Sequence, residues 1–401
     1  MKRTLAWAYE YAPGVGSEAG SGWVWARMLA GFSETWVMTS PYPPRADVLE
    51  SHIRDVPEGR HIQIVYVDIP RWMRRILGQP RGSRLERLEY VLWQFAALRA
   101  SRRLHRLHSF DLIWHLTWAN VWIGSLACRL GPTFVFGPVG GGVNPPWRLV
   151  PALGARGAAH EAVRAFARIV ARHFNPLGHL TWSRARLILV QNPETREWLP
   201  KRHRAKTFVF PNAVLEEATE RRSPGNVGPS AALFAGRLLP LKGASFAIEA
   251  MALLPGWRLI VCGAGPDERR LRELTHRLLL NERIGFRGWQ PREEVLRLMR
   301  DEAHVLLFPS LHDEGSWVVA EAVACGLPVV CLDRGGPAVL AGGGVAATTP
   351  GATVQRLAAA VLSAEARPLV APRTDLASSR SRLTDLLRRA GLLSEVAGTA
   401  E

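Results

Sequence analysis

Residues 312–330, HDEGSWVVAEAVACGLPVV, combine titratable side chains with an apolar helical pattern. Asp313 and Glu314 stand just before the apolar run, and Glu321 stands inside it, between Ala320 and Ala322. A carboxylate among apolar neighbours needs a charged or hydrogen-bonding partner, because an unpaired charge is costly to bury. The sequence therefore predicts that Glu321 meets either a protein group or a ligand.

A second group of candidate residues lies in FAGRLLPLKG, residues 234–243. This stretch joins a predicted strand to a predicted helix, with Gly236 relaxing the backbone and Arg237 and Lys242 bracketing the turn. Free amides, the helix dipole and two cations favour an anion such as a diphosphate. Only four of the 51 basic residues are lysines, so Lys242 suggests that a compact point charge is wanted there. The alternative interpretation is an ordinary solvated turn.

The stretch VCGAGPDERRL, residues 261–271, is another glycine-rich turn between a strand and a helix. It reads G-x-G-P, so Gly263 and Gly265 are explained by a tight turn at least as well as by ligand binding.

Short apolar runs alternate with amphipathic segments along the whole chain, which is typical of a parallel sheet covered by helices. In the first half the runs are TLAWAYEY, TWVMTS, IQIVYVDI, FDLIWHL, TFVFGPV and LILVQN, and in the second half AALFAGRL, RLIVCGAG, HVLLFPS and PVVCLD. The pattern predicts two doubly wound α/β domains. Ligands of such sheets bind at the carboxyl ends of the strands, so we expect the chemistry in a cleft between the domains.

Composition places the domain boundaries. Residues 1–213 form the predicted N-terminal domain, which would be the acceptor side by the resemblance described below, and the polar, Pro- and Gly-rich residues 214–230 form a linker. Residues 231–373 form the predicted nucleotide-sugar-binding domain by the resemblance described below, and residues 374–401 a C-terminal helix and tail that returns to the first domain.

The composition excludes several classes of protein. The chain has 401 residues, of which 47% are apolar, which is too many for a disordered chain. Its four cysteines lack C-x-x-C spacing, which argues against a zinc site or a disulfide framework. No apolar run is long enough for a membrane span or a signal peptide, so we expect a cytoplasmic protein.

The formal net charge is +16, and the basic residues are unevenly spread. Residues 71–106 hold ten arginines against only Glu86 and Glu89, with Trp72 and other apolar residues interleaved. This stretch predicts attachment to an anionic membrane surface. Nucleic acid, a phosphate-rich substrate and a merely solvated face are the alternatives.

Read in order, the second-half motifs resemble those of family 4 glycosyltransferases, which have the two-Rossmann GT-B fold. The family pattern G-R-L-x-x-x-K-G is followed by G-x-G-P, then by F-x-G (Phe286 to Gly288 here), and then by an E-x7-E element ending in E-A-x-A-x-G-L-P-V. The chain departs from this pattern at its first acidic position, where it has Asp313, with Glu314 beside it.

The resemblance implies roles for these residues. Glu321 would accept hydrogen bonds from ribose hydroxyls, and Asp313 or Glu314 would contact the donor sugar. Amides at the helix start would face the diphosphate. The implied nucleotide-sugar-binding set comprises Gly16, Gly236, Arg237, Lys242, Gly263, Gly265, Arg287, Gly315, Ser316, Trp317, Val318 and Glu321.

The first domain also resembles a branch of this family. In EYAPGVGSEAGSGWVWA, residues 10–26, Gly16 would let the backbone approach the donor phosphate, and Glu18 would face the cleft. His115, after the strand FDLIW, would contact the donor sugar or its leaving phosphate, with core packing as the alternative. GPVGGG, QNPETREWL and FPNAV also match.

The resemblance implies a retaining glycosyltransferase that moves a sugar from a nucleoside diphosphate sugar to a glycan or lipid-linked acceptor, in polysaccharide or glycolipid synthesis. No separate cofactor and no nucleic acid are expected. The chain lacks a D-x-D metal motif, so Arg237 and Lys242 would neutralise the leaving diphosphate without a metal. The expected location is the cytoplasm, with peripheral attachment to the inner face of the cell membrane. A GT-B sugar-nucleotide epimerase and a non-catalytic basic nucleic-acid- or membrane-binding module are the rival interpretations.

Overall fold

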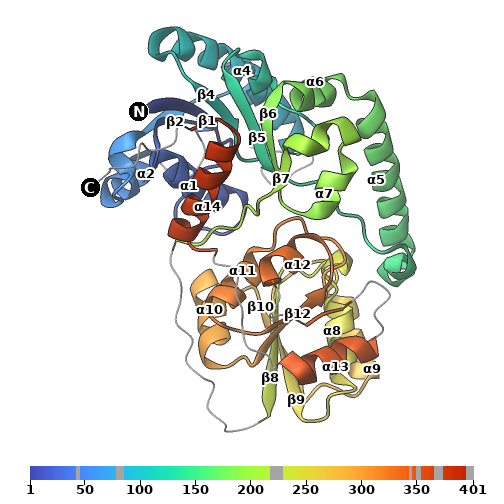
Figure 1. Cartoon of the computed structure of the whole chain (residues 1–401). Coiled ribbons are helices and arrows are strands. Elements are labelled where there is room, and N and C mark those ends of the chain that lie inside the picture. The colour runs from blue at the N-terminus through green and yellow to red at the C-terminus, as the bar shows by residue number, and fades with distance from the viewer. Residues whose placement is uncertain are drawn as a thin grey trace.

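The protein consists of two α/β domains stacked one above the other (Figure 1). The structure, a computed structural model, describes residues 1–41, 46–77, 85–118, 120–216, 229–342, 346–348, 354–364 and 374–393. The predicted fold class, two doubly wound parallel sheets, is confirmed.

The N-terminal domain contains a parallel sheet of seven strands in the order β3-β2-β1-β4-β5-β6-β7. The strands are β1 (Lys2–Trp7), β2 (Ser33–Thr39), β3 (Ile62–Tyr66), β4 (Leu112–His115), β5 (Thr133–Val139), β6 (Ala185–Val190) and β7 (Thr207–Val209). The helices are α1 (Ser17–Ala30), α2 (Ala46–Asp55), α3 (Arg71–Leu77), α4 (Glu86–His108), α5 (Gly154–Phe174), α6 (Pro176–Arg184) and α7 (Pro193–Trp198). The short strand β7 was not among the apolar runs noted in the sequence.

The C-terminal domain contains a parallel sheet of six strands in the order β10-β9-β8-β11-β12-β13. The strands are β8 (Ser230–Ala235), β9 (Trp257–Cys262), β10 (Ile284–Gly288), β11 (Val305–Phe308), β12 (Val329–Leu332) and β13 (Ala346–Thr348). The helices are α8 (Ala244–Met251), α9 (Glu268–Arg277), α10 (Arg292–Asp301), α11 (Trp317–Ala324), α12 (Gly335–Ala341) and α13 (Val354–Ala364).

Both sheets reverse their strand order at an equivalent point. The reversal lies between β1 and β4 in the first sheet and between β8 and β11 in the second. Loops that leave neighbouring strands at such a point run to opposite faces of the sheet, which opens a crevice for a ligand. The fold therefore predicts that the loops after these four strands carry the site.

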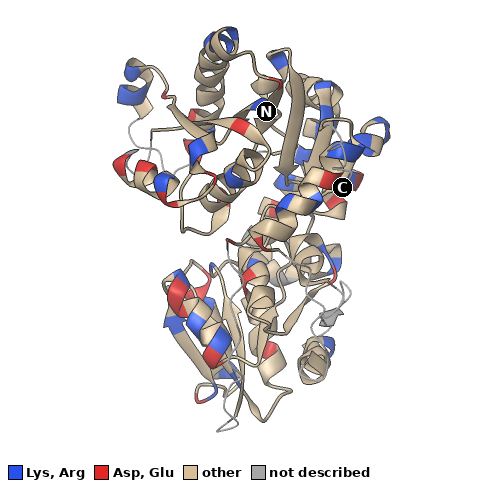
Figure 2. Ribbon diagram, turned by 60° about the vertical axis from the view of Figure 1, so that its left-hand side comes forward, with Lys and Arg blue, Asp and Glu red and all other residues tan. Residues whose placement is uncertain are grey.

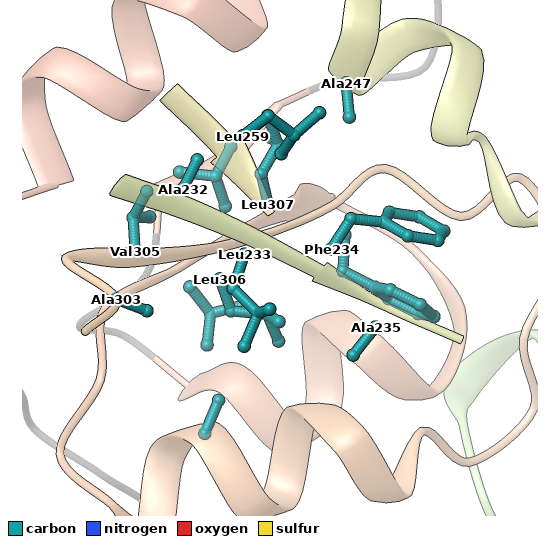
Figure 3. Close-up of a cluster of buried hydrophobic side chains, with 14 of the residues drawn as sticks. Ala232, Leu233, Phe234, Ala235, Ala247, Leu259, Ala303, Val305, Leu306 and Leu307 are labelled. Carbon is teal, nitrogen blue, oxygen red and sulfur yellow. The ribbon is translucent and has the colours of Figure 1, made fainter. Parts of the chain in front are cut away.

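Alternation along the strands builds the cores. In β1, Leu5 and Trp7 enter a cluster with Tyr90 and Trp93 of α4, whereas Ala6 enters the cluster on the opposite face of the sheet. In the second domain the side chains of β8, β9 and β11 pack together around Leu233, Phe234 and Leu306 (Figure 3). These side chains are almost fully buried, so the sheet is a rigid base for its loops.

Helix α14 (Leu376–Arg389) packs against α1 of the first domain (Figure 1). Leu383 and Leu387 are fully buried in the first domain's core, and Arg380 pairs with Glu58. Most of the predicted linker lies outside the described residues, as do residues 365–373 and 394–401. At the edge of the linker, the N–H of Leu215 donates to the carbonyl of Thr374 at 2.9 Å. This hydrogen bond joins the segment that leaves the first domain to the segment that returns to it.

None of the helices within the described ranges is long and apolar enough to cross a membrane.

The turns after β8 and β9 pack backbone to backbone, which holds the candidate anion-binding turn in place. The N–H of Gly236 donates to the carbonyl of Cys262 at 2.9 Å, and that of Leu238 to Ala264 at 3.0 Å. Gly263 has a φ of +148°, and a Cβ there would lie 1.9 Å from the carbonyl oxygen of Gly236. The glycine at 263 is therefore required by packing, as the tight-turn interpretation of G-x-G-P predicts.

We expect Gly263→Ala to destabilise the protein by about 3 kcal/mol or more, because the added methyl group separates the two turns. The matched control is Gly256→Ala, where a Cβ would meet nothing within 4 Å. It should change the free energy of unfolding by less than about 0.5 kcal/mol. Urea denaturation of both variants measures the difference, and equal midpoints would contradict the packing argument.

Candidate active site

A cavity of about 900 Å³ lies between the two domains. From the N-terminal domain it is lined by the residues after β1, β4, β5 and β6 and by parts of α4 and α5; from the C-terminal domain it is lined by the residues after β11. The lining residues include Glu18, Arg87, Trp118, Trp122, Ile123, His160, Val163, Arg164, Ala167, Asn212, Asp313, Glu314, Gly315 and Trp317. Residues far apart in the sequence thus meet at the two reversal points of the sheets.

Lys242 forms an ion pair with Asp313, which lines this cavity. Lys242 Nζ lies 2.5 Å from Asp313 Oδ2 and 5.6 Å from the centre of the Phe308 ring. The pair joins the turn after β8 to the loop after β11. Arg237, on the same turn, is exposed and makes no ion pair with any residue that the structure describes. Lys242 is thus held in position by Asp313, whereas the Arg237 side chain is free to bind an anion.

Glu314 points the other way, into the N-terminal domain. Its Oε1 accepts the N–H of Val143 at 3.0 Å, and its Oε2 accepts Asn192 Nδ2 at 2.8 Å and Thr195 Oγ1 at 3.1 Å. Both carboxylate oxygens are therefore occupied by protein groups. Of the two adjacent carboxylates, Asp313 is the one beside the cations, and Glu314 joins the domains.

The backbone around Glu314 fits this contact closely. A Cβ on Gly315 would lie 2.3 Å from Asn212 Oδ1, and one on Gly140 would lie 2.9 Å from Glu314 Cβ. In the reverse direction, Glu194 Oε1 accepts the N–H of Gly335 at 2.8 Å, at the start of α12. Two carboxylates, one from each domain, therefore cross the same boundary.

Helix α11 begins at the cleft, with Ser316 as its N-cap residue. The first amides of a helix have no partner within it, so those of Trp317 and Val318 are available to an anion. The Ser316 hydroxyl and the Trp317 indole N–H are buried without a hydrogen-bond partner among the described residues. Polar groups left unpaired at a helix start are suited to binding an anionic ligand.

Glu321 has a protein partner, so one of the two alternatives for its surroundings is realised, and the expected contact with a ribose stays a prediction. Arg292 Nε lies 2.6 Å from Glu321 Oε1. Burial raises the pKa of Glu321, and the Arg292 guanidinium opposes that rise. Arg292 begins α10 and was not among the residues selected from the sequence, because nothing in QPREEV marks it apart from other arginines.

His115 lies in the core and is not among the residues that line the cavity, so the structure gives no support to the expected contact with the donor. It is fully buried, and its Nε2 is 2.9 Å from the Tyr90 hydroxyl. Burial lowers the pKa of His115 to about 3, which keeps the ring neutral. The alternative of core packing fits this environment. A histidine after a strand could not be distinguished from a site residue by sequence, since the direction of the ring depends on α4.

Glu18 lines the cavity, as expected. Its Oε2 accepts the backbone N–H of Trp118 at 3.0 Å, and burial raises the pKa of Glu18 to about 7. Trp118 has a φ of +55°, which is uncommon for a side chain of this size. A carboxyl group with a pKa near neutrality can exchange a proton with a bound hydroxyl group.

The remaining predicted residues fall into two groups. Gly236, Gly263 and Gly265 pack the two turns of the second domain together. Gly16 is the N-cap residue of α1, and Arg287 is an exposed residue near the end of β10. Sequence reasoning missed Asn192 and Thr195, although Asn192 followed by Pro193 is a recognisable helix start.

No group of three or more His, Cys, Asp or Glu residues able to hold a metal ion occurs in the described part of the chain.

We expect Glu314→Ala to lower the free energy of unfolding by about 2–3 kcal/mol, because it leaves the buried N–H of Val143 without an acceptor and leaves the Asn192 amide with only the backbone carbonyl of residue 314. The matched control is the neighbouring Asp313→Ala, which leaves Lys242 with access to water and should cost less than about 1 kcal/mol. Thermal or urea unfolding separates them. An equal or larger loss in Asp313→Ala would show that Glu314 does not join the domains.

Comparisons with known proteins agree with this geometry. Residues 216–379 match the family described as "Glycosyl transferases group 1". A D-inositol 3-phosphate glycosyltransferase of Mycobacterium marinum is 36% identical over 136 residues, which is 32% of this chain and 28% of that protein. A phosphatidylinositol N-acetylglucosaminyltransferase subunit of Arabidopsis thaliana is 34% identical over 145 residues, which is 34% of this chain and 32% of that protein. The chain thus aligns with less than a third of each relative's length.

Solved structures match over almost the whole chain. Anabaena HepE in complex with UDP-glucose has a TM-score of 0.58 at 18% identity, covering 97% of this chain and 100% of that one. The sucrose-phosphate synthase of Thermosynechococcus elongatus has a TM-score of 0.59 at 18% identity, covering 98% and 97%. The chain therefore has the two-domain GT-B fold, and its second domain is similar to the group 1 glycosyl transferases.

Proposed function

We propose that this protein is a retaining, metal-independent glycosyltransferase that uses a nucleoside diphosphate sugar. The observation that carries the proposal is the cluster at the reversal point of the second sheet. There Lys242 pairs with Asp313, Arg237 lies exposed on the same turn as Lys242, and the start of α11 follows Asp313 closely in the chain. Two cations and free amides suit a diphosphate, and a carboxylate next to it suits sugar hydroxyls.

The proposed reaction breaks the bond between the donor sugar's anomeric carbon and the diphosphate oxygen. Negative charge then builds on the leaving diphosphate, and Arg237, Lys242 and the α11 amides stabilise that charge. The acceptor hydroxyl attacks from the same face, and its proton passes to the leaving phosphate. Glu18, with its pKa near 7, lies across the cavity where it would accept a hydrogen bond from the acceptor.

The proposed acceptor is a glycan or a lipid-linked molecule, and the proposed setting is polysaccharide or glycolipid synthesis. Support comes from the relatives named above, two of which act on inositol phosphate or phosphatidylinositol by name. No cofactor beyond the donor is proposed. Basic positions are spread over both domains (Figure 2), which gives little support to a dedicated nucleic-acid face.

The direct test is a thermal-shift screen of nucleoside diphosphate sugars, followed by product analysis with the best donor. A donor at a hundred times its dissociation constant should stabilise the protein by about 2.7 kcal/mol. Release of the nucleoside diphosphate with transfer of the sugar to an acceptor supports the proposal. Conversion of the donor into an epimer without transfer would identify an epimerase instead, and no response to any donor would refute both.

We predict that Arg237→Ala lowers kcat/KM by at least about tenfold, because it removes a charge-assisted contact to the leaving diphosphate. Arg237 has no described ion-pair partner, so this variant is cleaner than Lys242→Ala, which also leaves Asp313 unpaired. The control is Arg269→Ala, whose side chain is 93% exposed on α9. Full activity in Arg237→Ala, or activity abolished by EDTA and restored by magnesium, would show that the diphosphate is neutralised in another way.

We also propose peripheral attachment to an anionic membrane through residues 71–106, of which residues 78–84 lie outside the described ranges. Trp72 and Ile76 of α3 and Phe95 of α4 are 59%, 76% and 60% exposed. Arg74 is not free, because it pairs with Asp68 and Glu89.

Flotation should therefore show binding to vesicles that contain anionic lipid. The double variant Trp72→Ser/Ile76→Ser should reduce the bound fraction of protein several-fold. Added salt should weaken the binding further. Equal binding to neutral and anionic vesicles would contradict this assignment.

A further inference from the structure

Helix α5 turns its apolar face away from the protein. Val163, Phe166 and Phe174 are 69%, 69% and 79% exposed, whereas the charged Glu161 and Arg168 are 5% and 2% exposed. The exposed apolar residues recur every three or four positions, which is the spacing of a stripe that a surface helix normally buries. An apolar stripe of this size on the outside indicates that something else covers it.

The inward contacts of α5 fix this orientation. The Arg168 guanidinium donates to the carbonyls of Gly142 and Val143 and lies 5.7 Å from the centre of the Trp122 ring. Arg164 pairs with Glu161 at 2.9 Å. Rotating the helix to bury its apolar stripe would expose these bonds to water and leave the two carbonyls unpaired, so the outward stripe is a property of the folded protein.

A groove of about 550 Å³ runs along the stripe. It is lined by Trp122, Ile123, Val163, Phe166, Ala167, Val170, Ala171, Phe174, Asn175 and Pro176. Four of these residues also line the cavity between the domains, namely Trp122, Ile123, Val163 and Ala167. The groove and the cavity are therefore adjacent, and because the cavity also holds charged side chains, a molecule with an apolar and a charged part would fit both.

The charges where the two meet are basic. Arg87 of α4 and His160 and Arg164 of α5 line the cavity on this side. Arg87 makes no ion pair within the described ranges, and the His160 side chain is 74% exposed. A free guanidinium beside an apolar groove favours an anionic group attached to a hydrocarbon chain, because the charge and the chain then each meet a matching surface.

We propose that the groove on α5 binds the hydrocarbon chain of the acceptor, and that the acceptor is an anionic lipid whose polar head enters the cavity between the domains. The proposal rests on the proposed glycosyl transfer and narrows its acceptor from a glycan or lipid-linked molecule to a lipid-linked one. It also assigns the α5 stripe a different role from that of residues 71–106, which would contact the bilayer surface.

The first test is calorimetric titration of the full chain with butyl, octyl and decyl phosphate, each below its critical micelle concentration. If the chain lies in the groove half buried, affinity should rise by about twofold for each added methylene group, since full burial gives about fourfold. Affinity that does not change from butyl to decyl phosphate would overturn the proposal.

The second test compares variants. Phe166→Ser/Val170→Ser should weaken decyl phosphate binding by about tenfold and leave butyl phosphate binding unchanged. The control is Leu253→Ser/Leu362→Ser, whose side chains are 47% and 60% exposed and lie outside both the groove and residues 71–106. Since all four positions are at the surface, thermal unfolding should be unchanged in both variants. Equal decyl phosphate affinity in the wild type and the groove variant would overturn the proposal.

Other occupants give different results. If sedimentation shows a wild-type dimer that Phe166→Ser/Val170→Ser dissociates, with decyl phosphate binding unaffected, a second copy covers the stripe and the proposal fails. If the groove variant loses only vesicle binding, the stripe contacts the bilayer, and the proposal also fails. Donor binding, measured by thermal shift, tests glycosyl transfer separately. If no donor binds to the wild type, glycosyl transfer is refuted. If a donor binds but the affinity for alkyl phosphates does not depend on chain length, only the lipid acceptor is refuted.

Discussion

The carboxylate of Glu314 joins the two domains beside the cavity that lies between them. It leaves the loop after β11 and accepts three hydrogen bonds from Val143, Asn192 and Thr195 of the other domain. Because its neighbour Asp313 is thereby fixed against Lys242, the same loop sets both the separation of the domains and the position of the cations. The narrow approach at Gly315 leaves no room for a side chain between the loop and Asn212.

The fold could be predicted well from the sequence, because apolar runs and glycine-rich turns report local structure directly. Two parallel sheets followed from alternating strand and helix patterns, and the cleft followed from the rule that loops at the carboxyl ends of strands meet. The exceptions were local. Strand β7, Thr207–Val209, has only three residues, and two of them are exposed, so it left no apolar run to recognise.

The site was less predictable, because side-chain direction depends on packing between distant elements. Glu321 was expected to face a ligand, and nothing in the sequence indicated that it would also pair with Arg292 of α10. His115 was expected at the cleft, yet it meets Tyr90 in the core. The sequence could not distinguish the adjacent Asp313 and Glu314. Their partners distinguish them in the structure, because Glu314 binds residues of the first domain and Asp313 binds Lys242. The outward direction of the apolar face of α5 could not be predicted either, since a helical pattern gives the position of an apolar stripe but not which side of the helix faces the protein.

The return of α14 to the first domain has a consequence for biosynthesis. The C-terminal segment completes a core whose other buried residues come from the first 214 positions, and it does so with Leu376, Leu383, Leu386, Leu387 and Leu392. Arg380 of the same segment pairs with Glu58. A ribosome delivers these residues only after the entire second domain has been made. The first domain must therefore wait with an incomplete core during translation, and its final consolidation comes after that of the domain that follows it. Until then the apolar surface that α14 covers is open to water, and exposed apolar surface of this kind is what makes a partly folded chain prone to aggregation.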